Sequence, residues 1–370
     1  MSSIAYVGLD VHKDKIAVAL FVGNERNPTV EDDFDNTLVE VKKRFRRWSN
    51  RYDDLRCCYE ASSCGYVLQR WLTDMGIHCE IASPSLIPTL PGDKRKTDRR
   101  DAKKLGRLYR AGELSFVHIP TEKEESVRSL VRCRETIRYD LLRSRHYVLK
   151  FLQLRGLSWH GGRNWTTAHM RYLKSLKFEG PNQIAWCEYM CLMEYKLSRL
   201  EELDRQIEEL AFSDAYAQMV GSLRCFKGVD THTAMVLVSE IGDISRFANA
   251  EQFMSYLGLA PGSYQSGNVS RDCPITKAGN SHCRHVLVEA AWHYRHCPYV
   301  SRELKARQAG QDVRVVAISW KAQHRLHKKF TRLCARTHRN KAAVAVAREL
   351  AGFIWAVGTL VFNVGLSKAA

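Results

Sequence analysis

The sequence predicts an α/β domain followed by a mainly helical remainder, a fold class of α/β plus α. Three observations support it. Short β-rich runs alternate with helical segments over the first 82 residues, two later segments repeat apolar residues at helical spacing, and the C-terminal third has the pattern of further helices. A chain of 370 residues is long enough for two or three domains. We place their boundaries at residues 1–118, 119–215 and 216–370.

The first domain is predicted to be a sheet covered by helices. The expected strands are residues 4–10, 15–22, 29–34, 55–60 and 78–82, and the first two form a hairpin. The amphipathic segments 38–48 and 63–75 provide the helices. Functional residues of such sheets gather at strand ends. Asp10 and Glu60 each end a strand and are therefore candidates.

A short basic segment, KTDRRDA, contains two more carboxylates. Asp98 and Asp101 are three residues apart, so they share one face of a helix and could hold one hard cation together. The cations around them suggest contact with phosphate groups, and the candidates are Lys96, Arg99 and Arg100. For the pair alone, the alternative is a solvated helix start with acids in its first turn.

The fold is expected to bring Asp10, Glu60, Asp98 and Asp101 together. Carboxylates at one site repel each other unless cations neutralise them. Magnesium is the expected ion, because it takes oxygen ligands and leaves positions open for phosphate oxygens and water. Taken singly, Asp10 could be an aspartate that starts a turn, and Glu60 an acid at a helix N-terminus.

Two long helices are predicted after the first domain. Residues 121–156 and 193–210 carry apolar side chains at spacings of three, four and seven, which favours a coiled-coil arm. Such an arm usually joins domains or protomers. Residues 157–183 contain glycines and tryptophans that interrupt the helices, and their pattern indicates no function.

The distal part is predicted to contain a helix-hairpin-helix unit, in which a tight glycine turn joins two helices, and a glycine-rich loop. Gly228 lies in the turn, where backbone amides could meet a phosphate, but Asp230 stands where a second glycine is expected. The loop at residues 258–268 presents two serines, Ser263 and Ser266. Two cations that follow it could bind a phosphate, Arg271 and Lys277.

The charge is strongly positive and unevenly distributed. The chain has 57 basic and 40 acidic residues, a net charge of +17, which indicates a nucleic-acid partner. Residues 301–350 have thirteen Lys or Arg and three Asp or Glu, so they supply 13 − 3 = +10. Helical cations of this kind favour contact with the phosphate backbone, and a solvated face is the alternative. The candidates are Arg325, Lys328, Lys329, Arg332 and Arg336.

Cysteine usage and hydropathy indicate a reducing cytosol and no membrane partner. The twelve cysteines form no CxxC pair, and the first residues lack the pattern of a signal peptide. The run 350–366 lacks charge but is shorter than the ~20 residues that span a bilayer. It is expected to be a buried terminal helix.

Seven motifs together resemble the DEDD transposases of the bacterial insertion-sequence one-hundred-and-ten family. They are YVGLDVHK, YEASSCGY, KTDRRDA, GVDTHTA, EIGDISRFANAEQFMSYLGLAP, YQSGN and ITKAGN, and their order spans nearly the whole chain. The resemblance implies a RuvC-like (RNase H-like) N-terminal domain, a coiled-coil arm and a C-terminal transposase domain. By motif match, the metal-binding acids are Asp10, Glu60, Asp98 and Asp101, and the nucleophile is Ser266.

The resemblance also implies an activity and partners. Such an enzyme cuts and rejoins double-stranded DNA through a phosphoserine linkage, with Mg²⁺ or substituting Mn²⁺. A bridge RNA pairs with donor and target DNA, so the protein need not read sequence itself. The expected assembly is a homodimer that forms a tetramer on DNA, associated with the nucleoid in the bacterial cytoplasm. We further predict that the acids of one protomer meet Ser266 of another.

Two other functions are compatible with the residues. A RuvC-like nuclease could cut branched DNA with water as the nucleophile, in which case Ser266 is structural. A basic architectural protein without catalysis is the third alternative. Covalent trapping on DNA separates the first two, and a loss of cleavage without magnesium excludes the third.

Overall fold

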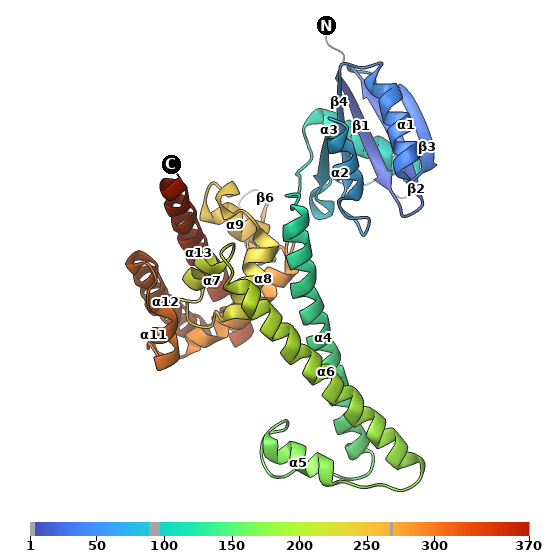
Figure 1. The fold of residues 1–370 in the computed structure, drawn as a ribbon. Helices are drawn as coiled ribbons and strands as arrows, with labels where there is room; N and C mark the ends of the chain where they lie inside the picture. The colour runs from blue at the N-terminus through green and yellow to red at the C-terminus, as the bar shows by residue number, and fades with distance from the viewer. Residues whose placement is uncertain (1–3, 89–96, 267–268, 370) are drawn as a thin grey trace. The chain divides into compact units, whose positions relative to one another are not determined.

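The computed structural model describes residues 4–88, 97–266 and 269–369, with side chains outside that description at 263–272 and 364–369. The chain forms two compact units, residues 1–120 and 121–370 (Figure 1). The helices predicted as an arm belong to the second unit. The three predicted domain boundaries stay a prediction.

The first unit is built on a five-stranded sheet of order β3-β2-β1-β4-β5. Its strands are β1 (Ile4–Val11), β2 (Lys15–Val22), β3 (Val30–Asp35), β4 (Asp54–Glu60) and β5 (His78–Ala82). The first three strands pair antiparallel, whereas β4 runs parallel to both β1 and β5. All five strands lie where the sequence predicts them. The strands other than β3 are largely apolar between polar turn residues, whereas β3 has the sequence VEDDFD and lies at the edge of the sheet.

Helices cover both faces of this sheet (Figure 1). Helices α1 (Leu38–Ser49) and α2 (Val67–Asp74) share a buried core with the odd-numbered residues of β1, such as Val7 and Leu9. Helix α3 (Asp98–Ala111) packs on the opposite face, against β2 and β4 as well as β1. Alternate residues of a strand face opposite sides, so even-numbered β1 residues face α3. Asp10 is one of them.

The second unit begins with two long helices that pack along each other. Helix α4 (Glu122–Gln153) starts at a capping box formed by Thr121 and Glu124. Helix α6 (Pro181–Ala211) starts twelve residues earlier than the predicted repeat, because Gly180 and Pro181 form a helix start. The short helix α5 (Thr167–Ser175) lies between them in sequence and shares their distal core.

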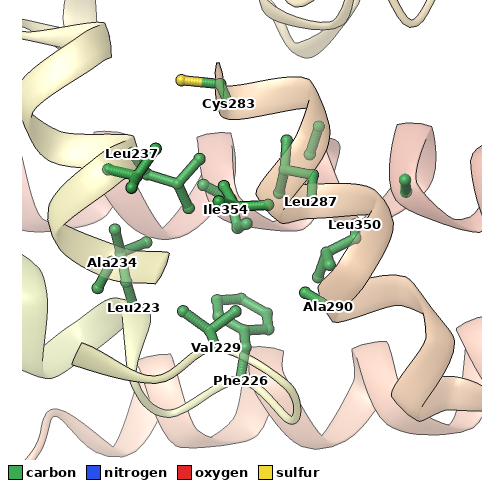
Figure 2. Close-up of a cluster of buried hydrophobic side chains, with 14 of the residues drawn as sticks. Leu223, Phe226, Val229, Ala234, Leu237, Cys283, Leu287, Ala290, Leu350 and Ile354 are labelled. Carbon is green, nitrogen blue, oxygen red and sulfur yellow. The ribbon is translucent and has the colours of Figure 1, made fainter. Parts of the chain in front are cut away.

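The remainder of this unit is a helical bundle with one hairpin. Its elements are α7 (Ala217–Leu223), α8 (Thr231–Ile241), α9 (Ala250–Tyr256), β6 (Pro261–Ser266), β7 (Val269–Ile275), α10 (Ser281–Ala291), α11 (Arg302–Gln308), α12 (Val313–Cys334) and α13 (Arg339–Ala369). Short 3₁₀ turns lie at Ile244–Arg246 and Trp292–Arg295, and another, Pro84–Leu86, belongs to the first unit. Figure 2 shows side chains of the turn after α7, of α8, of α10 and of α13 meeting in one core.

The C-terminal helix α13 packs into the bundle core. Over the described residues, Arg339–Asn363 is one helical stretch long and apolar enough to cross a membrane. Its Leu350 and Ile354 are buried against other helices of the unit (Figure 2). The predicted terminal helix is therefore a helix with a buried face, and it begins eleven residues earlier than the apolar run, at Arg339.

Candidate metal centre and serine hairpin

Strand β1 and helix α3 approach each other to backbone contact. A Cβ atom on Gly8 would lie 2.2 Å from both the carbonyl oxygen of Ala102 and the amide nitrogen of Gly106. A Cβ on Gly106 would lie 2.8 Å from the ring of Phe21. Glycine at both positions therefore lets the helix lie directly on the sheet. This contact brings the first turn of α3, with Asp98 in it, toward the end of β1.

Three side chains gather at that place. The Nε2 atom of His12 lies 3.3 Å from Oδ2 of Asp10 and 3.6 Å from Oδ1 of Asp98. Among the described residues, these three form the one group whose potential ligand atoms all lie within 4.8 Å of one another. Two carboxylates and an imidazole at this spacing suit a divalent cation. We call Asp10, His12 and Asp98 the acid–histidine cluster.

Asp101 and Glu60 lie near the acid–histidine cluster but do not belong to it. The parallel ladder pairs Leu9 with Tyr59, so Asp10 and Glu60 occupy the next positions on neighbouring strands and share a sheet face. Glu60 is exposed there. Asp101, one helical turn after Asp98, is close enough to act on the charge of Asp10. The structure thus brings all four predicted acids to one end of the sheet.

The electrostatics of this site disfavour the ionised form of Asp10. Partial burial is the main cause that raises its pKa above 3.8, and the carboxylates of Asp101 and Asp98 raise it further, while His12 acts in the opposite direction. A bound cation would favour the charged form. The carboxylates of the cluster have no lysine or arginine partner among the described residues.

The neighbouring cations of α3 are held by acids of β3 instead. Arg99 donates to Asp33 at 2.9 Å, and the Nζ atom of Lys103 lies 2.8 Å from Glu31. Arg99 is still exposed, as is its neighbour Arg100, so both stay candidates for phosphate contact. Lys96, the third cation predicted from this segment, lies outside the described residues.

His12 is the member of the cluster that the sequence analysis did not identify. The signal was available in the motif YVGLDVHK, where His12 follows Asp10 by two residues and strand alternation predicts a shared face. Histidine is not a usual ligand of Mg²⁺, so an expected magnesium site does not point to it. The tight turn between β1 and β2, which begins at His12, holds the residue in place.

Ser263 and Ser266 lie on a β-hairpin, where the sequence analysis predicted a loop. Strands β6 and β7 pair antiparallel, with Ser263 opposite Asp272 and Ser266 opposite Val269. The loop prediction was wrong because Gly267-Asn268 is a two-residue hairpin signal. Ser266 ends its strand, as Asp10 nearly ends β1. Their side chains and that of Arg271 lie outside the described residues.

The base of this hairpin is anchored to the bundle by the ITKAGN motif. Gly279 has φ +131°, and a Cβ there would lie 2.0 Å from the carbonyl oxygen of Tyr256. Asn280 accepts from the amide of Cys283 to cap α10 and donates to Glu240 at 2.7 Å. The motif therefore holds the chain that follows the hairpin. Lys277, predicted to bind phosphate, is exposed within it.

The glycine turn before α8 has a packing role. A Cβ on Gly228 would lie 2.7 Å from the carbonyl oxygen of Ala290. Asp230 accepts from the amide of Thr233 at 2.7 Å and so caps α8 with its own carboxylate. This carboxylate occupies the position that a phosphate would take at the helix N-terminus. Asp230 thus gives a physical reason why this turn departs from a phosphate-binding one.

Helix α12 carries an exposed basic face, although not all of its cations are unpaired. Arg325 and Lys329 both pair with Glu349 of α13. The other predicted cations are exposed and have no acidic partner among the described residues. Two of them lie one turn apart on α12, and the third lies in the turn after the helix ends at Cys334. They are Lys328, Arg332 and Arg336.

Comparison with known families identifies the class of protein. A model of DEDD transposases matches residues 7–155, which include all four predicted acids. The model of the Transposase IS116/IS110/IS902 family matches residues 221–307, which include the hairpin. The first match covers most of the first unit and continues through α4, and the second lies within the second unit. The class of protein is therefore an insertion-sequence transposase.

The similarity to other transposases covers most of the chain. The protein y4qE of Sinorhizobium fredii is 36% identical over 356 residues, 95% of this chain and 88% of the relative. The transposase for insertion sequence element IS1533 of Leptospira borgpetersenii is 34% identical over 90% of this chain and 97% of its own length. The transposase for IS1111A of Coxiella burnetii is 24% identical over 97% and 91%.

The chain therefore belongs to the IS110 family of transposases. Membership implies DNA binding and an enzyme that cuts and rejoins DNA. DEDD transposases normally use a divalent metal, and the donor atoms of the acid–histidine cluster fit one.

Proposed function

We propose that this transposase cuts and rejoins DNA through a phosphoserine intermediate, with a divalent cation, Mg²⁺ or a substituting Mn²⁺, held by Asp10, Glu60, Asp98 and Asp101. One observation carries the proposal: the acids at the end of β1 and the start of α3 face one another without a lysine or arginine among the described residues to neutralise them. Acids left in this state repel each other, and a cation would relieve the repulsion.

Each part of the chain has a separate task in this proposal. The bound cation would polarise a phosphate oxygen and neutralise the charge that develops in strand cleavage. The acids hold it and keep its position fixed, because Asp10 lies on a strand and Asp98 on a helix in backbone contact with that strand. Ser266 supplies the attacking oxygen, and its proton must pass to a base as the bond to phosphorus forms and the DNA oxygen leaves. Arg271 and Lys277 bind the scissile phosphate.

We propose double-stranded donor and target DNA and a bridge RNA as partners. The exposed cations of α12 support contact with nucleic-acid backbones irrespective of sequence. A protein that binds mainly backbones needs another source of specificity, and a pairing RNA supplies it. Sequencing the RNA that co-purifies with the protein tests this part; one abundant structured species is expected, and its absence would contradict RNA guidance.

The larger-scale features complete the proposal. Residues 1–118 are proposed as a RuvC-like domain, and α4 with α6 as a coiled-coil arm. The protein is proposed to act in the bacterial cytoplasm as a homodimer that assembles into a tetramer on DNA. Light scattering with and without DNA measures that assembly.

Metal removal tests the proposed function. Protein treated with a chelator should bind DNA carrying the element's ends but leave it uncut, and added Mg²⁺ or Mn²⁺ should restore cutting. Cutting that continues in excess chelator would contradict the metal-based proposal.

A water-using nuclease is the second candidate, favoured by one observation. Every member of the acid–histidine cluster belongs to the first unit, so the metal ligands do not require the hairpin. In that case metal-dependent cutting would persist in Ser266→Ala.

A further inference from the structure

We propose that His12 is a nitrogen ligand of the divalent cation, which makes the centre a mixed nitrogen and oxygen site that favours Mn²⁺ over Mg²⁺. The inference rests on the proposed function, because it concerns the ion that the acids are proposed to hold. It adds a ligand that the four-acid description lacks.

The geometry around the imidazole carries this inference. Nε2 of His12 faces Oδ2 of Asp10 at 3.3 Å and Oδ1 of Asp98 at 3.6 Å, so a single nitrogen points between two carboxylates. All three potential ligand atoms lie within 4.8 Å of one another. Ligand atoms about 2 Å from one ion can lie no more than about 4 Å apart, so small side-chain shifts bring all three onto one centre.

The backbone holds His12 in this position. Its amide donates to the carbonyl oxygen of Lys15 at 2.9 Å, and its own carbonyl oxygen accepts from the side chain of Asn36 at 2.8 Å. The side chain of His12 is 55% exposed, and its imidazole lies within ion-pair distance of both carboxylates. It is therefore oriented without being buried, which leaves space for water and a phosphate oxygen on the same ion.

The ligand set determines which ion is favoured. Mg²⁺ strongly prefers oxygen ligands and binds imidazole poorly, whereas Mn²⁺ lies above it in affinity for mixed donors. A centre with one imidazole and several carboxylates should therefore bind Mn²⁺ more tightly than Mg²⁺. The difference in affinity should be smaller at a centre made of four carboxylates alone. Removal of His12 should reduce this discrimination.

The experiment uses Mn²⁺ alone as the probe, on the full chain without DNA. Electron paramagnetic resonance of free Mn²⁺ gives the affinity, and pulsed measurements detect coupling between bound Mn²⁺ and a directly bound ¹⁴N nucleus. The variants are His12→Gln, which removes the ligand nitrogen, and His12→Asp, which replaces it with a carboxylate. Circular dichroism confirms that each variant is folded.

His78 provides a matched control. It lies 3.3 Å from Glu80, the same separation as between His12 and Asp10. Its place in β5 is opposite Arg56, whereas Glu60 pairs at the other end of the same strands with Ala82. His78→Gln therefore removes a histidine–carboxylate pair from the same unit without touching the cluster.

Wild type and His78→Gln should show nitrogen coupling to bound Mn²⁺. His12→Gln should lose this coupling, and its affinity for Mn²⁺ should be lower by about tenfold or more. His12→Asp should bind Mn²⁺ without nitrogen coupling and discriminate less against Mg²⁺. Nitrogen coupling that persists in His12→Gln would show that His12 is not the nitrogen ligand. The same conclusion follows if wild type binds Mn²⁺ at Asp10 but shows no nitrogen coupling. Either result leaves the metal centre itself in place. Mn²⁺ binding unchanged in Asp10→Asn and Asp98→Asn would overturn the metal centre itself, and the inference with it.

Discussion

Acidic side chains have opposite environments in the two units. In the first unit, the imidazole of His12 lies between the carboxylates of Asp10 and Asp98, and neither carboxylate has a lysine or arginine partner within the described part of the chain. In the second unit, Glu240 is 2% exposed and accepts two hydrogen bonds from Arg132, at 2.6 and 2.9 Å, and a third from Asn280.

The pKa values follow this difference. Burial raises the pKa of Asp10, and neighbouring carboxylates add to the effect. Burial also acts to raise the pKa of Glu240, but Arg132 and Asn280 outweigh it and lower the pKa below 4.5. Glu135, which contacts His232, Arg134 and Arg138, is shifted in the same direction as Glu240 for the same reason.

The comparison separates two uses of a buried or half-buried acid. Glu240 is fully satisfied by its own chain, joins α4 to α8 and α10, and needs no further partner. The acid–histidine cluster lacks such partners among the described residues and therefore costs stability that a cation would offset. A substitution in the cluster should change chemistry, whereas a substitution at Glu240 should change folding.

The largest effect is expected in the cluster. Asp98→Ala combined with Asp101→Ala should reduce DNA cleavage by about a thousandfold, because the cation that neutralises the transition state is lost. Cleavage of labelled DNA under single-turnover conditions measures it. Thermal unfolding without metal should be unchanged or slightly improved. Substantial residual cleavage would mean that the two acids are not ligands.

The next effect is on stability. Glu240→Ala should lower the free energy of unfolding by about 3 kcal/mol, because two arginines and Asn280 lose their shared acceptor. Urea denaturation measures the change. Glu209→Ala, which removes an exposed partner of Arg205, is the control and should have little effect. Equal effects of the two substitutions would show that burial of Glu240 does not matter.

The stability that Glu240 provides should also depend on pH. Its folded pKa is lowered, so the contribution is fully present above the ordinary value of 4.5 and is lost as pH falls through the folded value. Wild type should therefore lose stability more steeply than Glu240→Gln below about pH 4.5. Parallel curves for the two proteins would contradict the lowered pKa.

A smaller effect is expected where β1 meets α3. Gly8→Ala should destabilise the first unit by about 2 kcal/mol and weaken metal binding, because its Cβ would meet backbone atoms at 2.2 Å and push α3 off the sheet. Gly106→Ala should cost less, since the atoms within 3 Å of its Cβ would belong to the side chain of Phe21 and not to the backbone. Denaturation and Mn²⁺ titration of both variants measure this. The reverse order would show that α3 is not fixed by Gly8.

The smallest effect of each substitution, on nucleic-acid binding, is expected at the cations of α12 and of the turn after it. Alanine at Lys328, Arg332 and Arg336 should weaken DNA and RNA binding and reduce its salt dependence by about one unit of slope for each lost phosphate contact. Alanine at Arg325 and Lys329 should change the slope less, because Glu349 already pairs with both. An unchanged slope in the triple variant would mean that this face is merely solvated.

The predictability of the two units also differs. The sequence predicted all five strands and placed Asp10, Glu60 and Asp98 at one end of the sheet, because apolar runs, crossover helices and strand ends follow local rules. The contact of Gly8 with Gly106 joins residues far apart in sequence. Local patterns do not reveal such contacts, so the reason for the closeness of Asp98 and Asp10 became visible only in the structure.

The sequence predicted the second unit less well at places where contacts between distant segments determine the local structure. The hairpin around Ser266 was predicted as a loop because glycines outweighed the turn signal at Gly267-Asn268. The pairing of Arg325 and Lys329 with Glu349 joins two helices and cannot be read from charge spacing within one of them. The spacing of charges in the sequence therefore predicted more cations without an acidic partner than the structure has.

Covalent trapping on DNA tests the central claim most directly. Wild type with Mg²⁺ and DNA containing the element's ends should yield a protein–DNA adduct whose phosphopeptide contains Ser266 as the modified residue. Ser263→Ala should still form the adduct, whereas Ser266→Ala, chelated wild type and the Asp98→Ala, Asp101→Ala variant should not. Metal-dependent cutting without any adduct, or an adduct at Ser263, would contradict the account.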